Sequence, residues 1–420
     1  MSAELTQLNC GKNIEEIGKL SPDTKLMTLG DCLDLIIDHR GKTPKKLGGD
    51  WTSKGIKAIS AKNVHGGKLS NQDEIRHVTN DIYKKWMKED VKKGDCLLVS
   101  EGATLGEHLY WDYEFPIVLS QRLFCLRVND RLLDSKYFYA FITSDYFQNQ
   151  INGRASGTSV FGLRQSELLK MLVPIIPLNT QKLIGDWHYS VNKKIDLLHR
   201  QNKTLEAMAE TLFRQWVVVE AGEDWEEKTL ADYADHLKDG VIPANKPIQL
   251  YTHYSLPSFD NGMKPIVESG SEILSNKYGV QPWTILVSKL NPRFPRIWPI
   301  GGSPGENAIC STEFQVFKPK DEKLYGYLYF LLKSNEAKEE LSTSASGTSG
   351  SHQRVRPADI LNLKINLPST KLAEQYSEFI MPNIKKLMAN LEQIHTLETL
   401  RDTLLPKLMS GEVRVDYTPG

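Results

Sequence analysis

Apolar residues recur every seven positions in the middle of the chain, at Ile184, Val191, Leu198, Leu205 and Leu212. Such a repeat is typical of a helix that packs along one seam against another helix. At 1.5 Å per residue, about 40 helical residues form a rod of roughly 60 Å. The pattern therefore predicts a long helical spacer over residues 179–220.

A coiled-coil seam uses two positions in every seven, so a companion row is expected beside this repeat. The candidates are Trp187, Met208 and Trp216, with Ile195 one step round the helix, and polar residues interrupt the row. Asn179 is a candidate side-chain cap for the first free backbone N–H groups. An acidic segment that begins at residue 220 marks the predicted end.

A second apolar stripe covers residues 369–412 and steps by threes and fours, as on one face of a helix. Pro382 lies inside this pattern, where it removes one backbone hydrogen bond and should kink the helix near its start. Met-Ser-Gly at 409–411 predicts the C-terminal end. The members of the stripe are Leu372, Tyr376, Ile380, Ile384, Leu387, Leu391, Ile394, Leu397, Leu400, Leu404 and Leu408.

Either stripe taken alone also fits a helix buried in a larger core. Because the same pattern occurs twice, a pair of helical spacers is the favoured interpretation. The rest of the chain has the texture of α+β globular domains, with short β-like runs such as 95–100 and 122–128, and a helical segment over 135–151. Globular domains are predicted at 21–178 and 221–368, with tails at 1–20 and 413–420.

The two globular segments align with each other. Ala-Ser-Gly-Thr-Ser at 155–159 recurs unchanged at 345–349, and Leu-Leu-Val-Ser at 97–100 aligns with Ile-Leu-Val-Ser at 285–288. A period of about 190 residues is too long for a solenoid and indicates a tandem duplication of one globular domain and one long helix. We expect a pseudo-two-fold relation between the copies, with antiparallel helices.

The composition limits the possible functions. The 420 residues include 52 basic and 52 acidic ones, so any nucleic-acid surface must be a segregated patch. No apolar run is long enough to cross a membrane, and no export signal is visible. The cysteines, which never fall at metal-binding spacings, predict free thiols in a reducing cytoplasm and no metal site. They are Cys10, Cys32, Cys96, Cys125 and Cys310.

Complete catalytic motifs are missing from the sequence. It has no glycine-rich phosphate loop, no His-Glu-x-x-His and no Gly-x-Ser-x-Gly. Asn-Pro-Arg-Phe at 291–294 is superficially similar to the base-binding motif of amino-methyltransferases, but it lacks the second proline. The sequence therefore predicts a protein without catalytic residues.

Two segments have the chemistry of DNA contacts. Residues 40–62 are basic, with interleaved Gly, Pro and hydrogen-bonding side chains, and residues 288–298 are basic and aromatic. Each alone also fits a solvated surface loop. Their occurrence at matched places in the duplicated frame favours binding. The candidate residues are Arg40, Lys42, Thr43, Lys45, Lys46, Lys62, Asn63, Lys289, Asn291, Arg293 and Arg296.

Along nearly its whole length, the chain resembles the specificity subunit of type I restriction-modification systems. The matching segments are Arg-Gly-Lys-Thr-Pro at 40–44, Leu-Val-Ser-Glu-Gly-Ala-Thr-Leu-Gly at 98–106, the Ala-Ser-Gly-Thr-Ser segment, Pro-Leu-Asn at 177–179 and the two helical spacers. The second domain lacks the first signature and the Gly-Ala-Thr loop, so the two halves are expected to read different sequences.

The resemblance implies a division of labour. Each globular domain would read one half of a bipartite double-stranded DNA target. The paired helices would set the spacing and dock two methylation subunits, which bring S-adenosylmethionine, and restriction subunits, which use ATP with Mg, would join them. The chain itself would bind no cofactor. The residues assigned to partner contact are Trp187, Val191, Leu198, Leu205, Leu387, Leu391 and Ile394.

Two other classes stay open at this point. One is a stand-alone DNA-modifying enzyme, which would bind S-adenosylmethionine by itself. The other is a coiled-coil scaffold without a DNA role, which would show no site-selective, salt-dependent DNA binding.

Overall fold

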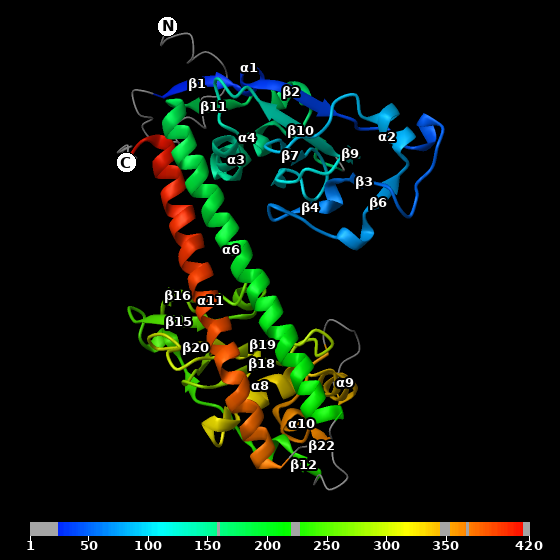
Figure 1. Cartoon of the computed structure of the whole chain (residues 1–420). Helices are drawn as coiled ribbons and strands as arrows, with labels where there is room; N and C mark the ends of the chain where they lie inside the picture. The colour runs from blue at the N-terminus through cyan, green and yellow to red at the C-terminus, as the bar shows by residue number, and fades with distance from the viewer. Residues whose placement is uncertain (1–23, 158–159, 220–226, 345–352, 367–368, 415–420) are drawn as a thin grey trace, which may run out of the picture. The chain divides into compact units, whose positions relative to one another are not determined.

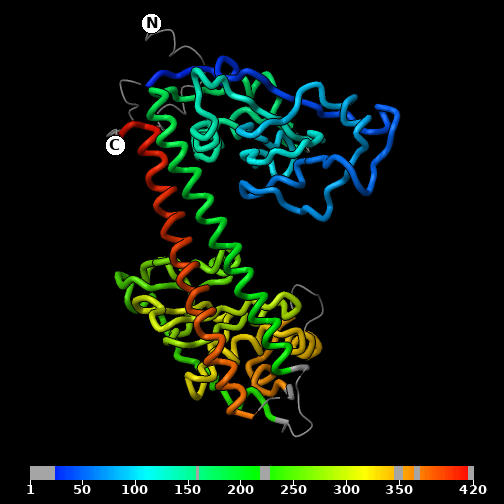
Figure 2. Tube along the Cα trace, in the orientation of Figure 1, coloured from blue at the N-terminus to red at the C-terminus, as the bar shows by residue number. Residues whose placement is uncertain are grey.

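The computed structural model describes residues 24–157, 160–219, 227–344, 353–366 and 369–414. The predicted tail at 1–20, most of the tail at 413–420, the acidic segment after 220 and the second Ala-Ser-Gly-Thr-Ser copy lie outside these ranges, as do the last two residues of the first copy. The chain divides into two compact units, residues 1–194 with 398–420 (unit 1) and residues 195–397 (unit 2). Each is described by itself (Figures 1 and 2).

Unit 1 is an α+β fold around a sheet with the strand order β2-β10-β7-β8, in which all neighbours are antiparallel. Helices α3 and α4 pack on one face, and the small sheet β6-β3-β9 packs on the other. The elements are β1 (Lys25–Thr28), α1 (Leu29–Cys32), β2 (Leu33–Asp38), β3 (Ile56–Ile59), β4 (Val64–His65), β5 (Lys68–Leu69), β6 (Arg76–Val78), α2 (Asn80–Trp86), β7 (Cys96–Val99), β8 (His108–Tyr110), β9 (Ile117–Leu119), β10 (Leu123–Val128), α3 (Ser135–Thr143), α4 (Asp145–Arg154), α5 (Gln165–Leu168) and β11 (Leu172–Ile175).

Strand β7 shows why this sheet is central. Cys96 and Leu98 pack with the helices, whereas Leu97 and Val99 pack with the small sheet. Successive side chains of a strand point to opposite faces. A strand that is covered on both faces therefore reads as a continuous apolar run, as the sequence has it.

Unit 2 repeats this plan with the sheet β13-β21-β18-β19, helices α8 and α9, and a second sheet of order β14-β17-β20-β15-β16. The elements are β12 (Glu227–Thr229), β13 (Ala234–Leu237), β14 (Gly240–Val241), β15 (Leu250–Tyr254), α7 (Leu256–Asp260), β16 (Ile266–Ser269), β17 (Lys277–Gly279), β18 (Ile285–Ser288), β19 (Ile297–Pro299), β20 (Ile309–Ser311), β21 (Phe314–Pro319), α8 (Tyr325–Lys333), α9 (Asn335–Ser344), α10 (Pro357–Leu361) and β22 (Lys364–Asn366).

The predicted duplication is confirmed by the equivalent order of strands in the two units. The alignment of 97–100 with 285–288 is wrong by one residue. Leu163 N donates to Ser100 O, and Val355 N makes the same bond to Lys289 O, so Ser100 corresponds to Lys289. A slip of one residue turns every side chain to the opposite face of the sheet. Letter similarity alone had hidden this shift.

Both predicted long helices are present. Helix α6 (Leu178–Phe213) continues as π-helical turns to Val219, and α11 (Thr370–Ser410) runs through Pro382. The end of α11 at Gly411 is confirmed by the φ of +77° at that residue, a conformation that glycine favours. No helix in the described ranges has the length and apolar character that crossing a membrane requires.

The predicted cap at Asn179 is wrong, because α6 already begins at Leu178. The Gln181 side chain holds this end of the helix instead. Its Nε2 donates to the carbonyls of Ile176 and Leu132, at 2.8 and 3.0 Å, and its Oε1 accepts from Asp134 N at 2.8 Å. These bonds tie the start of α6 to the segment before α3.

The companion row of the α6 seam differs from the predicted one. The buried row is His188, Ile195, Asn202 and Ala209, whereas Met208 is 52% exposed. A seam alternates steps of four and three residues, so the row four places after Ile184 faces inward. Two of its members are polar, and that is why the apolar pattern of the sequence did not show it.

Helix α11 packs antiparallel to α6 within each unit. In unit 2, Tyr376 donates to Ala209 O at 2.9 Å and Asn390 Nδ2 donates to Asn202 Oδ1 at 2.8 Å. In unit 1, Arg401 Nη1 donates to Asn192 Oδ1 at 2.8 Å. Contact positions on α11 thus rise in number as those on α6 fall.

Ion pairs anchor α6 to the globular part of each unit. In unit 1, the carboxylate of Asp112 accepts from Tyr189 and lies 2.8 Å from Lys193 Nζ. In unit 2, Lys333 Nζ lies 2.9 Å from Glu206 and 3.5 Å from Glu210. Each unit therefore includes its own stretch of the long helices as part of its structure.

Candidate DNA and partner surfaces

Arg40, the first candidate of the basic loop, is held inside unit 1. Its Nε and Nη2 pair with the Asp38 carboxylate at 2.9 and 2.6 Å, and its guanidinium lies 4.5 Å from the Phe124 ring centroid. The hydrogen bonds that Arg40 donates to Asp38 raise the pKa of Arg40. A guanidinium already bound in two places is suited to fixing the loop to β2 and β10 rather than to reading a base.

The lysines of this loop fall into two groups. Lys42 Nζ donates to Trp86 O at 2.9 Å and Lys46 Nζ to Gly41 O at 2.7 Å, so both brace the loop. Burial, followed by the nearby Lys88, lowers the pKa of Lys42. Lys45 and Lys62 are exposed. Among the candidate residues of this loop, Lys45 and Lys62 are therefore the cations best placed for phosphates.

Two polar candidates of the loop have local roles. Thr43 Oγ1 accepts from Lys46 N at 3.4 Å. Asn63 is buried, and its Oδ1 accepts from both the backbone N–H and the hydroxyl of Ser60, at 3.1 and 3.0 Å. The prediction that Asn63 contacts DNA is wrong for this reason, since its polar atoms are used inside the fold.

The two basic segments do not lie at matched places, as the sequence interpretation had assumed. Residues 40–62 follow β2, whereas residues 288–298 follow β18, the counterpart of β7. The counterpart of Asn291 is Gly102, because both residues have a positive φ. The backbone N–H of Asn291 donates to the segment before α10, and that of Gly102 donates to the equivalent segment before α5. Each loop must therefore be judged on its own contacts.

Most candidates in the unit 2 loop are also engaged. Lys289 Nζ donates to Thr312 O, and burial lowers the pKa of Lys289. Asn291 has a φ of +53° and turns the backbone. Arg296 pairs with both oxygens of Asp260, at 2.7 and 2.9 Å. Arg293 is exposed, and it has no ion pair with any described residue.

The helix residues assigned to partner contact are mostly inside the protein. Val191, Leu198, Leu387 and Ile394 are buried against the chain itself, which corrects their assignment. They hold α6 to α11 and leave no surface for another subunit. Trp187, Leu205 and Leu391 are half-buried.

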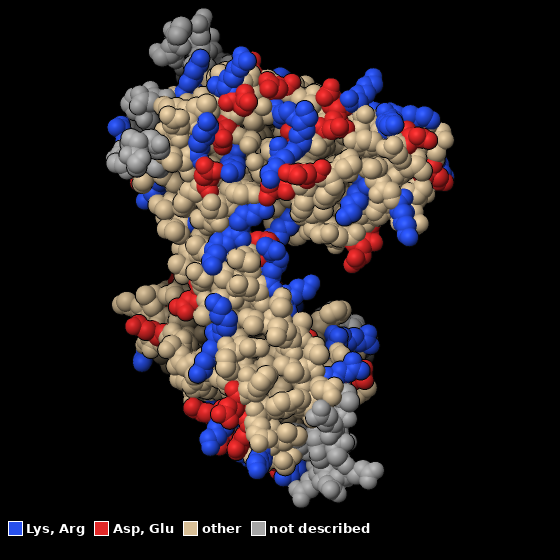
Figure 3. Space-filling view, in the orientation of Figure 1, with Lys and Arg blue, Asp and Glu red and all other residues tan. Residues whose placement is uncertain are grey.

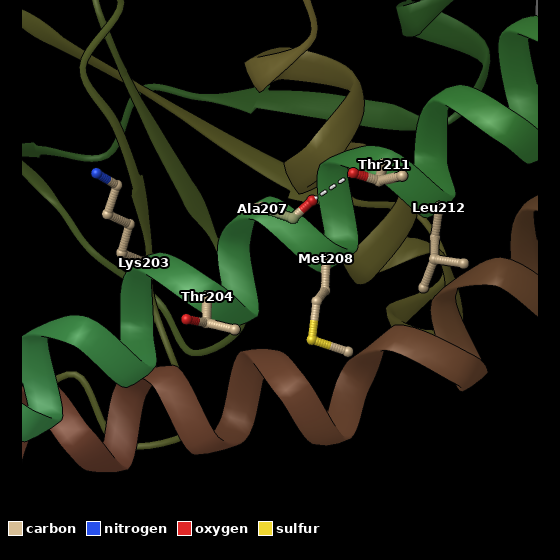
Figure 4. A pocket seen from close by; sticks show the side chains of 6 residues that line it. All are labelled: Lys203, Thr204, Ala207, Met208, Thr211 and Leu212. Carbon is tan, nitrogen blue, oxygen red and sulfur yellow. Dashed lines mark hydrogen bonds between the residues drawn. The ribbon is translucent and has the colours of Figure 1, made fainter.

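An apolar groove on α6 is a better candidate for a partner surface. Its lining includes Ala207, Met208 and Leu212, flanked by Lys203, Thr204 and Thr211. Figure 4 shows Met208 and Leu212 extending towards α11 while Lys203 points away. On the face shown in Figure 3, the surface of unit 2 over the two helices is largely uncharged. Exposed apolar surface of this kind is typical of protein contacts.

The groove sequence is itself repeated, a signal that the sequence interpretation missed. Thr-Leu-Glu-Ala-Met-Ala-Glu-Thr-Leu at 204–212 matches Thr-Leu-Glu-Thr-Leu-Arg-Asp-Thr-Leu at 396–404. Leu400, which the sequence placed in the seam of α11, is 43% exposed in unit 1 and corresponds to Met208 of unit 2. Both long helices thus expose a large apolar side chain at the same point of the repeat.

The cysteines are structural in the described ranges. Cys32, Cys96, Cys125 and Cys310 are free and buried, and burial raises the pKa of each thiol; Cys10 lies outside the description. The described residues include no cluster of three or more His, Cys, Asp or Glu that would hold a metal.

Two α+β units whose central sheets have the same strand order, each containing one end of an antiparallel helix pair, define a protein built by internal duplication. The sequence matches the type I restriction modification DNA specificity domain twice, over residues 22–207 and 222–398. The chain belongs to this family.

Individual relatives agree with the family. The type I restriction enzyme MjaIX specificity subunit of Methanocaldococcus jannaschii is 23% identical over 447 residues, covering 96% of each chain. The MjaVIII specificity subunit of that organism is 22% identical over 195 residues, 46% of this chain and 44% of its own. The S subunit structure of a type I system from M. genitalium matches with a TM-score of 0.61 at 16% identity, covering 93% of this chain and 96% of that one, and shows a shared fold.

Proposed function

We propose that this chain is the DNA-recognition subunit of a type I restriction-modification complex, in which each unit reads one half of a bipartite double-stranded target. The duplication carries this proposal. Two copies of one recognition fold, differing in their loops, suit two different half-sites. The family membership supports the same function.

Candidate cations whose side chains bond to no described residue supply the electrostatic part of binding. Lys45 and Lys62 in unit 1 and Arg293 in unit 2 are exposed. Since the chain has equal numbers of basic and acidic residues, these local groups rather than net charge attract the duplex. Phosphate contacts of this kind position the protein, and base contacts add the sequence preference.

The long helices set the spacing of the half-sites and dock two methylation subunits. The groove around Met208 in unit 2 and the exposed Leu400 at the matching point of the repeat in unit 1 support two equivalent docking sites, one on each long helix. The apolar side chains of the seam are buried between the two helices and cannot contact a partner. Met208 and Leu400 lie outside the seam and are exposed, so a partner can contact them.

The chemistry belongs to the partner subunits in this proposal. Methylation subunits bring S-adenosylmethionine, restriction subunits join with ATP and Mg, and this chain contributes neither cofactor nor catalytic residues. The support is the family and the lack of complete catalytic motifs in the sequence. Such a complex works on cellular DNA, so we place it in the cytoplasm.

The test is to express the chain with its cognate methylation subunit and to map methylated adenines. A bipartite motif that depends on both proteins is expected. Steady methyl transfer by the isolated, homogeneous chain would favour a stand-alone DNA-modifying enzyme. A complex without site-selective, salt-dependent DNA binding would favour a scaffold without a DNA role.

A further inference from the structure

A hairpin in unit 2 carries an exposed phenylalanine close to its tip. Strands β18 and β19 pair from Ile285 with Pro299 to Val287 with Ile297, and Ser288 N closes the loop by donating to Arg296 O at 3.0 Å. Phe294 in this loop is 71% exposed. An aromatic side chain of this size is usually buried in the fold, so its exposure indicates a binding site.

The backbone that carries Phe294 is pinned. Phe294 N donates to Asn291 O at 2.9 Å, and Asn291 N donates to Gln353 O at 3.0 Å. On the strand side, Val355 N donates to Lys289 O at 3.0 Å. A loop held in this way presents its side chain without losing backbone freedom when it binds, and that favours affinity.

Two cations without ion pairs stand beside the ring. A cavity of about 350 Å³ is lined by Phe294 together with Arg293, Lys338, Arg296 and Asp260. The Asp260 carboxylate is neutralised by both nitrogens of Arg296. Arg293 and Lys338 pair with no carboxylate among the described residues, so this site has an excess of positive charge.

We infer that Phe294 is a wedge that unstacks one base step of the half-site read by unit 2, while Arg293 and Lys338 contact the flanking phosphates. This inference rests on the proposed function and adds a means of recognition to it. Apolar side chains inserted between base steps are a known way to kink DNA. Steps that unstack easily, such as TA and CA, would then be preferred at that position without any base-specific hydrogen bond.

The charges favour DNA over a protein as the ligand of this site. A protein surface that covered Phe294 would also bury two unpaired cations, which is costly unless it supplies carboxylates in the right places. Phosphates flank every base step and would neutralise both cations. The groove at Met208 has the opposite character, apolar and largely uncharged, and it suits a protein partner.

Unit 1 has no such wedge in the equivalent loop. The counterpart segment, residues 101–107, is Glu-Gly-Ala-Thr-Leu-Gly-Glu and contains no aromatic residue. Base unstacking is therefore expected in one half-site only.

The experiment uses the complex with the cognate methylation subunit and duplexes of the mapped target that carry 2-aminopurine at successive positions. Binding should raise the fluorescence at one step of one half-site, because an unstacked 2-aminopurine is brighter. Phe294→Ala should abolish that rise and weaken binding about tenfold. Arg293→Gln and Lys338→Gln should each lower the salt dependence by about one unit and keep the fluorescence rise.

Phe379→Ala provides a control, because Phe379 is a 56% exposed phenylalanine of unit 2 that lies on α11 and outside the loop that carries Phe294. It should leave the fluorescence rise unchanged. Equal fluorescence and affinity in wild type and Phe294→Ala would overturn the wedge proposal. It would also be overturned if Phe294→Ala lost binding of the methylation subunit while its DNA contacts stayed intact. Failure of the wild-type complex to bind its site selectively would refute the proposed function instead.

Discussion

At the scale of single residues, the contacts separate cations that we propose to bind DNA from cations that hold the fold. Lys45 is exposed, whereas Arg40 is paired with Asp38 and packed on Phe124. Both belong to one basic segment of the sequence. Only the geometry shows that their substitutions should have different consequences.

Lys45→Gln should weaken DNA binding to all sequences alike and reduce the slope of log affinity against log salt by about one. Arg40→Gln should instead lower the thermal unfolding midpoint, because it breaks an ion pair with two hydrogen bonds and exposes an aromatic face. Binding titrations at several salt concentrations, together with thermal melts, check both. Lys25→Gln, at an exposed lysine on β1, is the control. Equal salt slopes for wild type and Lys45→Gln would contradict the assignment.

The buried His188 should make unit 1 sensitive to acid. Burial, followed by the nearby Arg401, lowers the pKa of His188 to about 3, and Thr143 Oγ1 lies 3.2 Å from its Nε2. His108 also lowers this pKa and Asp402 raises it. The unfolded chain gains the proton near pH 6.5 and the folded one does not. Stability is therefore complete above pH 6.5 and is lost as the pH falls towards 3, by up to about 1.4 kcal/mol per pH unit.

His188→Gln removes this titration and should flatten the decline of the unfolding midpoint between pH 6.5 and 4.5. His39, whose pKa burial lowers to about 4, titrates in the same window, so His39→Gln is the comparison that separates the two contributions. An unchanged pH profile in His188→Gln would show that His188 is not the group responsible.

At the scale of elements, the antiparallel helix pair has a polar layer in its seam. Asn202 and Asn390 are both buried and bond to each other, and Asn202 Nδ2 also reaches Leu387 O at 3.5 Å. A buried asparagine costs stability and specifies register, since any other alignment leaves its polar atoms unpaired.

Asn390→Leu alone should destabilise unit 2 by about 1–3 kcal/mol, because it leaves the buried side-chain oxygen of Asn202 without its donor. The double variant Asn202→Leu with Asn390→Leu should recover most of that loss, since neither polar group is then buried without a partner. Urea unfolding of the four members of this cycle is the measurement. Additive losses in the double variant would mean that the two amides are not coupled.

The exposed apolar side chains at matching points of the repeat, Met208 and Leu400, predict separate docking of two methylation subunits. Met208→Glu should remove one and Leu400→Glu the other, each weakening its site by about 2 kcal/mol or roughly thirtyfold. The double variant should bind neither. Native mass spectrometry of the purified complexes counts the subunits. Gln393→Glu, an equal charge change at an exposed position of α11, is the control and should bind both.

At the scale of the whole molecule, the long helices are proposed to measure the gap between half-sites. Inserting four residues near Gln201 in α6 adds about one turn, or roughly 6 Å. An insertion of four is tolerated by a coiled-coil seam with local unwinding. Base pairs are about 3.4 Å apart, so the gap should grow by one or two base pairs.

A methylation map of the insertion variant should show a longer gap between the same half-sites, because no recognition loop has changed. Four residues inserted at the exposed β4–β5 turn, after Gly66, should leave the gap as it was. Altered half-sites with an unaltered gap would refute the spacer role of the helices.

The two long helices, the duplication and the α+β class of each unit could be predicted from the amino-acid sequence. These features follow from periodicity and repetition, which can be read directly from the sequence. The side of a helix or strand on which a residue lies depends only on its spacing from nearby residues in the chain. Buried apolar runs such as 96–99 were predicted for the same reason.

Which polar groups are exposed and which are bonded inside the fold could be seen only in three dimensions. His188 and Asn202 are residue types usually found on the surface, yet residues distant in sequence bury them and bond to their side chains. Met208 and Phe294 are residue types usually found in the core, yet both are exposed. Burial depends on what the rest of the chain places opposite a residue, and composition and spacing carry no record of that.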